Sequence, residues 1–137
     1  TMEIELTRKN DGYLFEAKNE SGNTVMIDAS PAIGGSGGGS RPMEVVIMAL
    51  GGCSSIDIVN ILKKQRQEIT SFQVKIHAER REGETPSLFK SIHVDYYIGG
   101  VDSDKAQRAA DLSIEKYCSV SKLLEPTVKI TYAVHSV

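Results

Sequence analysis

The segment Arg41-Pro42-Met43-Glu44-Val45-Val46-Ile47-Met48-Ala49-Leu50-Gly51-Gly52-Cys53-Ser54 decides the fold, because it opens a long and strongly apolar helix. Pro42 fits the first turn of a helix, and apolar residues then continue to Leu62 without another proline. The first half is apolar on every side, so we expect it to be buried. Gly51 and Gly52 each cost a helix about 1 kcal/mol relative to alanine. This pair therefore predicts that another helix packs closely at this point.

Short strands are predicted on both sides of this helix. Before the helix, the sequence predicts an antiparallel meander of three short strands separated by turn signals, at residues 3–8, 13–18 and 24–28. After it, residues 72–78 and 88–98 predict a hairpin, Asp102 or Ser103 begins a second helix that reaches Tyr117, and residues 128–134 form a last strand. This order of elements predicts an α+β domain.

The domain organisation follows from the same pattern. We expect one domain over residues 2–137, with a strand meander at 2–28, a Gly/Ser-rich loop at 29–41, and the helix, hairpin, helix and strand at 42–137. The glycine- and serine-rich composition of residues 34–40 predicts a flexible linker. They lack the lysine and the spacing of a phosphate-binding loop, so we expect no nucleotide there.

Composition limits the classes of function. The chain has 137 residues, 40% of them hydrophobic and 25% charged, which is typical of a globular protein and argues against disorder or membrane insertion. A formal net charge of -2 without a basic stripe argues against nucleic-acid binding. The first residues lack the pattern of a secretory signal, so we predict a cytoplasmic protein.

The residues best suited to chemistry are the two cysteines, Cys53 and Cys118. A reducing compartment disfavours a permanent disulfide, which leaves a transient redox pair or two inert buried thiols as the alternatives. Two cysteines alone cannot complete a zinc site, and His77, His93 and His135 fall on the polar registers of predicted strands. We therefore predict no metal and no cofactor.

The two thiols differ in their expected surroundings. Cys118 ends an amphipathic helix just before a new turn, where its sulfur can be exposed and the amides of a helix start lower a thiol pKa. Cys53 lies about 16 Å along its helix from Pro42, and burial alone would keep it protonated. A reactive Cys53 needs a cation, which Arg8, Lys9 or a second subunit would supply.

The chain resembles the OsmC/Ohr family, the osmotically induced and organic hydroperoxide resistance proteins. The resemblance rests on Pro42-Met43-Glu44 leading into Gly51-Gly52-Cys53-Ser54, on Glu115-Lys116-Tyr117-Cys118-Ser119-Val120-Ser121, and on the order of elements. It implies the OsmC-like fold, with antiparallel strands around a long central helix, in an intertwined homodimer. The central helices of the two subunits would pack together, and each site would draw on both chains.

The resemblance also implies thiol peroxidase chemistry. Cys53 would attack the peroxide and become a sulfenic acid, Cys118 would resolve it into a disulfide, and a cellular dithiol would reduce the disulfide. The family's peroxidases hold the thiolate with an arginine from the first strands and pair that arginine with a glutamate. The nearest residues of these types here are Arg8 and Glu44, to which the resemblance would give these roles.

This chain departs from the peroxidase pattern in three places. Met43 follows the proline where the peroxidases have the glutamate, and Glu44 comes one position later, about 100° around the helix. The arginine position itself falls on Asn10, and Ser119 stands where proline is common.

Three functions are compatible with these residues. The first is a thiol-dependent peroxidase that reduces organic hydroperoxides. The second is a non-enzymatic dimer that binds an apolar small molecule, or carries sulfur, in a pocket lined by Met43, Val46, Ile47 and Leu50. The third is a structural dimer with two inert cysteines.

Overall fold

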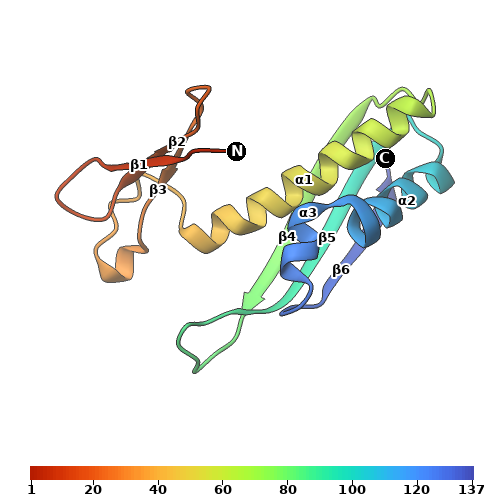
Figure 1. Ribbon diagram of the computed structural model, residues 1–137. Helices are drawn as coiled ribbons and strands as arrows, with labels where there is room; N and C mark the ends of the chain where they lie inside the picture. Colours follow the sequence, from red (N-terminus) through yellow and green to blue (C-terminus); the bar gives the residue numbers. More distant parts are fainter. The chain divides into compact units, whose positions relative to one another are not determined.

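The computed structural model describes residues 1–137, which form two compact units, 1–46 and 47–137. The long helix α1 (Pro42–Lys64) begins in the first unit and continues through the second. Its bounds agree with the helix predicted from the sequence. Figure 1 shows the three strands that precede α1 and the three strands and two further helices that follow it.

The first unit contains a three-stranded antiparallel sheet, as predicted. Its strands are β1 (Glu5–Arg8), β2 (Phe15–Lys18) and β3 (Thr24–Ile27), in that order. The turn between β1 and β2 is closed by the Asn10 side chain, whose Oδ1 accepts the Gly12 N–H at 2.9 Å and the Leu14 N–H at 3.3 Å. No apolar side chain of residues 1–46 is fully buried. A small sheet without a core is marginal alone, so this one needs another apolar surface to cover it.

The Gly/Ser-rich segment is an ordered loop, and the prediction of a flexible linker was wrong. The loop folds around Asp28, which is 1% exposed. The Asp28 carboxylate accepts hydrogen bonds from the Ser36 hydroxyl at 2.6 Å, the Ser36 N–H at 3.0 Å and the Ala29 N–H at 2.8 Å. A Cβ atom at Gly35 would lie 1.8 Å from the Ala29 carbonyl oxygen, so close backbone contact requires glycine there.

The second unit contains a sheet with strand order β4-β5-β6, formed by β4 (Ser71–Arg80), β5 (Phe89–Gly99) and β6 (Ile130–Ser136). The predicted hairpin is β4 and β5, which pair antiparallel. The last strand differs from the expectation of antiparallel strands, because β6 runs parallel to β5. A parallel partner requires a long crossover, and the helices between β5 and β6 provide it.

The helices cover one face of this sheet (Figure 1). They are α1, α2 (Ser103–Leu112) and α3 (Ser119–Leu124), and a π-helical turn (Ser113–Tyr117) joins the last two. From Ile92 to Ile98 on β5 the covered side chains alternate with more open ones, and the covered ones are Ile92, Val94, Tyr96 and Ile98. From α2 the small residues Ala106, Ala109 and Ala110 are buried, and their spacing places them on one face of the helix.

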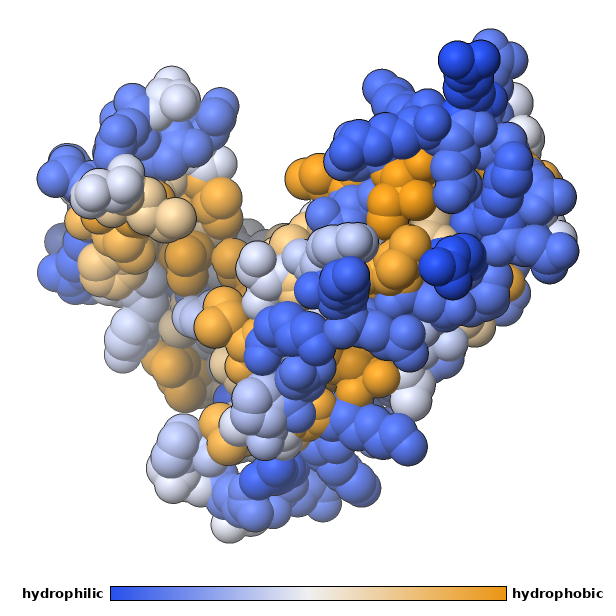
Figure 2. Space-filling view, turned by 45° about the vertical axis from the view of Figure 1, so that its right-hand side comes forward, coloured by the Kyte–Doolittle hydropathy of each residue, from blue (hydrophilic) through white to orange (hydrophobic).

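Helix α1 is buried on one side only, so the prediction of a first half buried all round does not hold for a single chain. Its buried residues recur with helical spacing at Leu50, Gly51, Ser54, Ile58 and Leu62. The opposite side is open, with Met48 57% and Ile56 71% exposed. Apolar surface is visible among the hydrophilic side chains of the second unit in Figure 2.

The two glycines of α1 have different surroundings. A Cβ atom at Gly51 would lie 2.9 Å from Cδ1 of Ile76 on β4, so the close neighbour at Gly51 is the sheet and not a second helix. A Cβ atom at Gly52 would meet nothing within 4 Å. No contact within one chain therefore requires glycine at position 52.

Length and hydropathy alone would let α1 cross a membrane, since an 18-residue window of it has a mean hydropathy of 1.9. Its packing gives a different interpretation. Leu50, Ile58 and Leu62 are completely buried, and Asp57 lies in the middle of the helix. We therefore interpret α1 as the core helix of a folded domain.

The Asp28 contacts give a first testable prediction. Asp28→Asn replaces one carboxylate oxygen with a donor, so amide hydrogen exchange in residues 34–40 should accelerate. The hydrogen bond from Ser36, followed by those from backbone amides, holds the pKa of Asp28 below its ordinary value of 3.8. The loop should therefore keep its protection above about pH 4 and lose it as the pH falls below that value.

Asp11→Asn, in an exposed turn, is the matched control. Exchange measured by mass spectrometry should change only in the Asp28 variant. Equal protection in both variants would mean that Asp28 does not organise the loop.

Candidate functional site

Cys53 lies on α1, between the buried residues Gly51 and Ser54. Its neighbour Ser54 is fully buried, whereas the Cys53 side chain is half-buried. The next turn of the same helix face carries Asp57, four residues later. Cys53 is therefore more accessible than the sequence-based expectation of a buried thiol.

Cys118 lies where the π-helical turn ends and α3 begins. Its N–H donates to the Ser113 carbonyl at 2.7 Å, and its own Sγ accepts the Ser121 N–H at 3.4 Å, so it is the N-cap of α3. The predicted new turn after Cys118 is thus confirmed. The predicted exposure is wrong, because Cys118 is 0% exposed.

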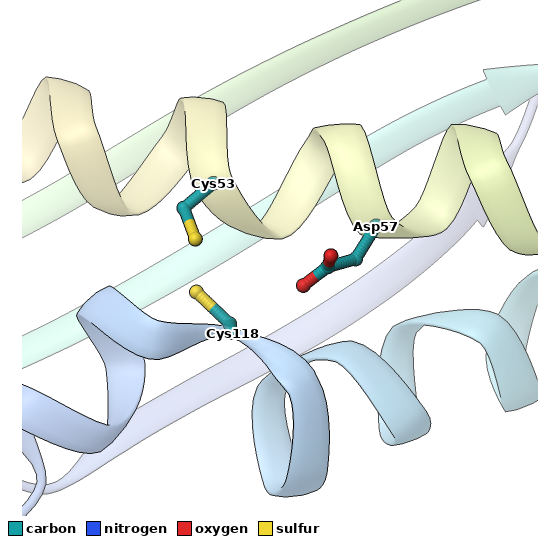
Figure 3. Close-up of side chains that lie close together, drawn as sticks. All are labelled: Cys53, Asp57 and Cys118. Carbon is teal, nitrogen blue, oxygen red and sulfur yellow. The ribbon is translucent and has the colours of Figure 1, made fainter.

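The fold brings the two thiols together. The Sγ atoms of Cys53 and Cys118 and a carboxylate oxygen of Asp57 all lie within 4.8 Å of one another. In Figure 3 the two sulfur atoms point toward each other, and the Asp57 carboxylate points into the same gap. Asp57 is a member of this cluster that the sequence analysis did not identify. Its i, i+4 spacing from Cys53 was the available signal.

A buried hydrogen-bond network holds the elements of this site in place. The Tyr96 hydroxyl on β5 donates to Ser54 Oγ at 2.6 Å, and Ser54 Oγ donates to the Leu50 carbonyl at 2.8 Å. The Ser113 hydroxyl donates to the Ser54 carbonyl at 2.9 Å and shares its one proton more weakly with Asp57 Oδ2 at 3.3 Å, so it joins the π-helical turn to α1. Satisfied polar networks of this kind fix one arrangement of buried elements.

The electrostatic environment keeps Cys118 protonated. Burial raises the pKa of the Cys118 thiol from its ordinary value of 9.0 to about 11, and the Ser121 N–H opposes this rise only in part. The helix start was expected to lower this pKa. The effect of desolvation on the pKa is larger than that of the helix start, because α3 has only six residues and the sulfur has no contact with water.

The predicted partners Arg8 and Glu44 lie in the first unit, where each has local contacts. The Arg8 guanidinium donates to the carbonyl oxygens of Asp11 and Gly12 in its own turn. Glu44 Oε1 accepts the Arg41 N–H at 2.8 Å, which is the capping contact of a glutamate in the first turn of a helix. A role for either residue beside the thiols stays a prediction.

The histidines lie on the open face of the second sheet, as predicted. His77 is exposed, while His93 and His135 are partly exposed and both hydrogen-bond to Oδ1 of Asp95, at 3.2 Å and 2.8 Å. The apolar pocket proposed from the sequence loses one of its members, because Leu50 is completely buried and cannot contact a ligand.

An open hollow of about 590 Å³ adjoins the site on the Asp57 side. It is lined mainly by residues of α1, together with Leu112 and Tyr117 from the segment before Cys118. Asp57 forms part of this lining and also has a carboxylate oxygen within 4.8 Å of both sulfur atoms. Of the three clustered residues, Asp57 is the one that borders this hollow.

The family model described as OsmC-like protein matches residues 35–133, which include both cysteines and Asp57. The chain belongs to the OsmC-like family. This confirms the resemblance derived from the cysteine motifs, and the arrangement of helices and strands confirms the predicted α+β fold.

Three comparisons illustrate how far the similarity extends. Protein YhfA of Escherichia coli K12 is 44% identical over 126 residues, covering 90% of each chain. A hypothetical protein from Aquifex aeolicus VF5 has a solved structure with a TM-score of 0.82 and 31% identity, covering 100% of this chain and 98% of that one. An organic hydroperoxide resistance protein OsmC from Legionella pneumophila gives a TM-score of 0.73 at 14% identity, over 98% and 96% of the two chains, and so shares the fold.

The contrast between the two thiols gives a second prediction. At pH 8, the fraction of Cys118 in the thiolate form is about 100-fold smaller with a pKa near 11 than with the ordinary pKa of 9.0. Iodoacetamide should therefore alkylate Cys118 at least about 100-fold more slowly in the folded protein than in urea. Because the folded state holds this proton more tightly, the associated stability is complete below pH 9 and is lost as the pH rises through about 11.

The measurement uses Cys53→Ser, so that Cys118 is the only thiol, with Cys118→Ser as the matched variant that reports Cys53. Mass spectrometry gives the labelling rate at each pH. Equal rates for Cys118 in folded and unfolded protein would contradict the assigned burial.

Proposed function

We propose that this protein is a thiol-dependent peroxidase of the OsmC-like type that reduces organic hydroperoxides. The observation that carries the proposal is the approach of two thiols, distant in sequence, to within 4.8 Å. Such a separation lets a disulfide form after small side-chain rotations. The Legionella pneumophila protein of the same fold is an organic hydroperoxide resistance protein, which supports the same substrate class.

The proposed reaction has three steps. The Cys53 thiolate attacks the terminal oxygen of R–O–OH, which breaks the O–O bond and yields the Cys53 sulfenic acid and an alkoxide that takes a proton to become ROH. The Cys118 sulfur then attacks the sulfenic sulfur, forming the disulfide and releasing water. A cellular dithiol reduces the disulfide and restores both thiols, which fits the reducing cytoplasm proposed for this protein.

The different burial of the two sulfurs supports their separate roles. The half-buried Cys53 is open to a peroxide, whereas the fully buried Cys118 is closed to it. A raised pKa also keeps Cys118 as a thiol until a sulfenic acid forms beside it. Cys53 is therefore the proposed nucleophile and Cys118 the proposed resolving thiol.

A peroxidatic thiolate needs a positive charge nearby, and the neighbouring charged group in the second unit is the Asp57 carboxylate. We retain Arg8 as the proposed cation, with Lys9 or a residue of a second subunit as the other sources. Glu44 stays the proposed partner of that arginine, in addition to its capping contact with Arg41.

The decisive experiment follows the loss of free thiols after cumene hydroperoxide or hydrogen peroxide is added to the reduced protein, with a chelator present. The wild type should form the Cys53–Cys118 disulfide and react faster with cumene hydroperoxide. Cys118→Ser should stop at a sulfenic acid that dimedone traps. Arg8→Ala should slow the reaction about tenfold or more, because the thiolate would lose the positive charge proposed to stabilise it.

Cys53→Ser is the control for background oxidation. If the wild type loses thiols no faster than this variant, the protein is not a peroxidase. A sulfenic acid without a disulfide in the wild type would remove only the role of Cys118.

We also propose that the protein acts as a homodimer in which the α1 helices of two chains pack together. The support is a stripe on the open side of α1, formed by Met48, Gly52 and Ile56 at four-residue intervals. All three residues are exposed, and the central glycine would let another helix approach closely. The uncovered sheet of residues 1–46 offers further apolar surface for such a partner.

Gly52→Leu tests the proposed interface. Its new side chain has free space in a single chain, so the protomer should fold normally, while dimerisation should weaken about tenfold or more because the added volume overfills the helix contact. Light scattering coupled to size-exclusion chromatography measures the mass, and circular dichroism checks the fold.

Leu123→Ala, at an exposed apolar residue of α3, is the matched control and should remain dimeric. A monomeric wild type would overturn the homodimer. A Gly52→Leu dimer as tight as the wild type would overturn this use of α1.

A further inference from the structure

The cluster of Cys53, Asp57 and Cys118 holds a group that the proposed peroxidase reaction does not use. Asp57 contributes a carboxylate beside two thiols, and all three ligand atoms lie within 4.8 Å of one another. In a peroxidase, this anion opposes formation of the thiolate. The same anion favours a bound cation.

We propose that, in its dithiol state, the protein binds one thiophilic divalent metal ion of the Zn²⁺ class through Cys53 Sγ, Cys118 Sγ and an Asp57 carboxylate oxygen. Thiolate sulfur and carboxylate oxygen are both ordinary zinc ligands. Three protein ligands leave a fourth tetrahedral position for water or another small ligand. The sequence-based expectation of no metal rested on having two cysteines alone, and Asp57 supplies the third ligand.

The geometry is close to what such a site requires. With metal–ligand bonds of about 2.0–2.3 Å, tetrahedral ligand atoms lie about 3.3–3.8 Å apart. Ligand atoms that already lie within 4.8 Å need side-chain movements on the order of 1 Å to close around an ion. Cys53 and Asp57 share one face of α1, and Cys118 is fixed as the N-cap of α3. The ligands are therefore held by regular secondary structure.

Charge favours a cation at this position. Two thiolates and one carboxylate together carry a formal charge of about -3 when deprotonated. Asp57 forms no salt bridge with any lysine or arginine, and its hydrogen-bond partner is the neutral Ser113 hydroxyl. A divalent ion reduces the formal charge of the cluster to about -1 and replaces the protons of both thiols.

The surroundings also supply an outer shell and an entry path. The Ser113 hydroxyl lies 3.3 Å from Asp57 Oδ2, and the Ser121 N–H lies 3.4 Å from Cys118 Sγ, so two of the three ligands have a hydrogen-bond donor beside them. The hollow of about 590 Å³ has Asp57 in its lining, so one of the three ligands borders an open surface from which an ion can reach it.

The test titrates the full-length, reduced protein with Zn²⁺ and Co²⁺ in the absence of peroxide, so that its outcome is independent of any peroxidase activity. One equivalent of Co²⁺ should produce the strong visible bands of a tetrahedral ion together with thiolate-to-cobalt charge transfer. Zn²⁺ should displace it stoichiometrically and protect both cysteines from iodoacetamide. The charge-transfer band separates this site from the surface histidines, which have no sulfur.

Asp57→Asn should keep the fold and bind Zn²⁺ about tenfold or more weakly, while Cys53→Ser should lose the charge-transfer band in large part. Asp104→Asn, at an exposed position of α2, is the matched control and should bind like the wild type. Absence of the band in the wild type would overturn the metal site. Equal affinity of Asp57→Asn and wild type would overturn Asp57 as a ligand.

Discussion

The hydrogen bonds around Ser54 are the constraint on which the rest of the second unit depends. Tyr96 donates to Ser54 Oγ, and Ser113 reaches the Ser54 carbonyl, in a region without access to water. A buried polar group that loses its partner costs about 1–3 kcal/mol. This cost leaves essentially one placement of the sheet, α1 and the π-helical turn. That placement puts Cys53, the residue before Ser54, opposite Cys118.

Burial then divides the chemistry between two residues of the same type. Cys118 is enclosed and its pKa is raised, whereas Cys53 stays half-buried beside a carboxylate. The reactivity of the site therefore depends on which cation enters it. An arginine side chain would favour thiolate attack on a peroxide, and a divalent metal would hold both sulfurs as ligands. In both proposals a positive charge offsets the negative charge of the thiolates and the Asp57 carboxylate. A metal-bound dithiol would have to release its ion before a disulfide could form.

The N-terminal loop shows where composition misleads. Five of the seven residues at 34–40 are glycine, which resembles a flexible linker. In the structure these glycines allow close backbone contacts and a positive φ, as at Gly35 and at Gly37, whose φ is 79°. The organising group is Asp28, a single buried acceptor placed just before the loop. Composition cannot distinguish glycine that provides flexibility from glycine that provides space.

The sequence by itself determined the order of helices and strands, the long apolar helix, and the two cysteines as the residues able to react. Periodicity is a local property, so it identifies which face of an element is apolar. It does not say what that face meets. Only the tertiary structure decided that Cys53 and Cys118 lie together, that Asp57 joins them, that Cys118 is the buried member of the pair, and that Gly51 approaches a strand. Each of these depends on contacts between distant segments, which a local pattern does not encode.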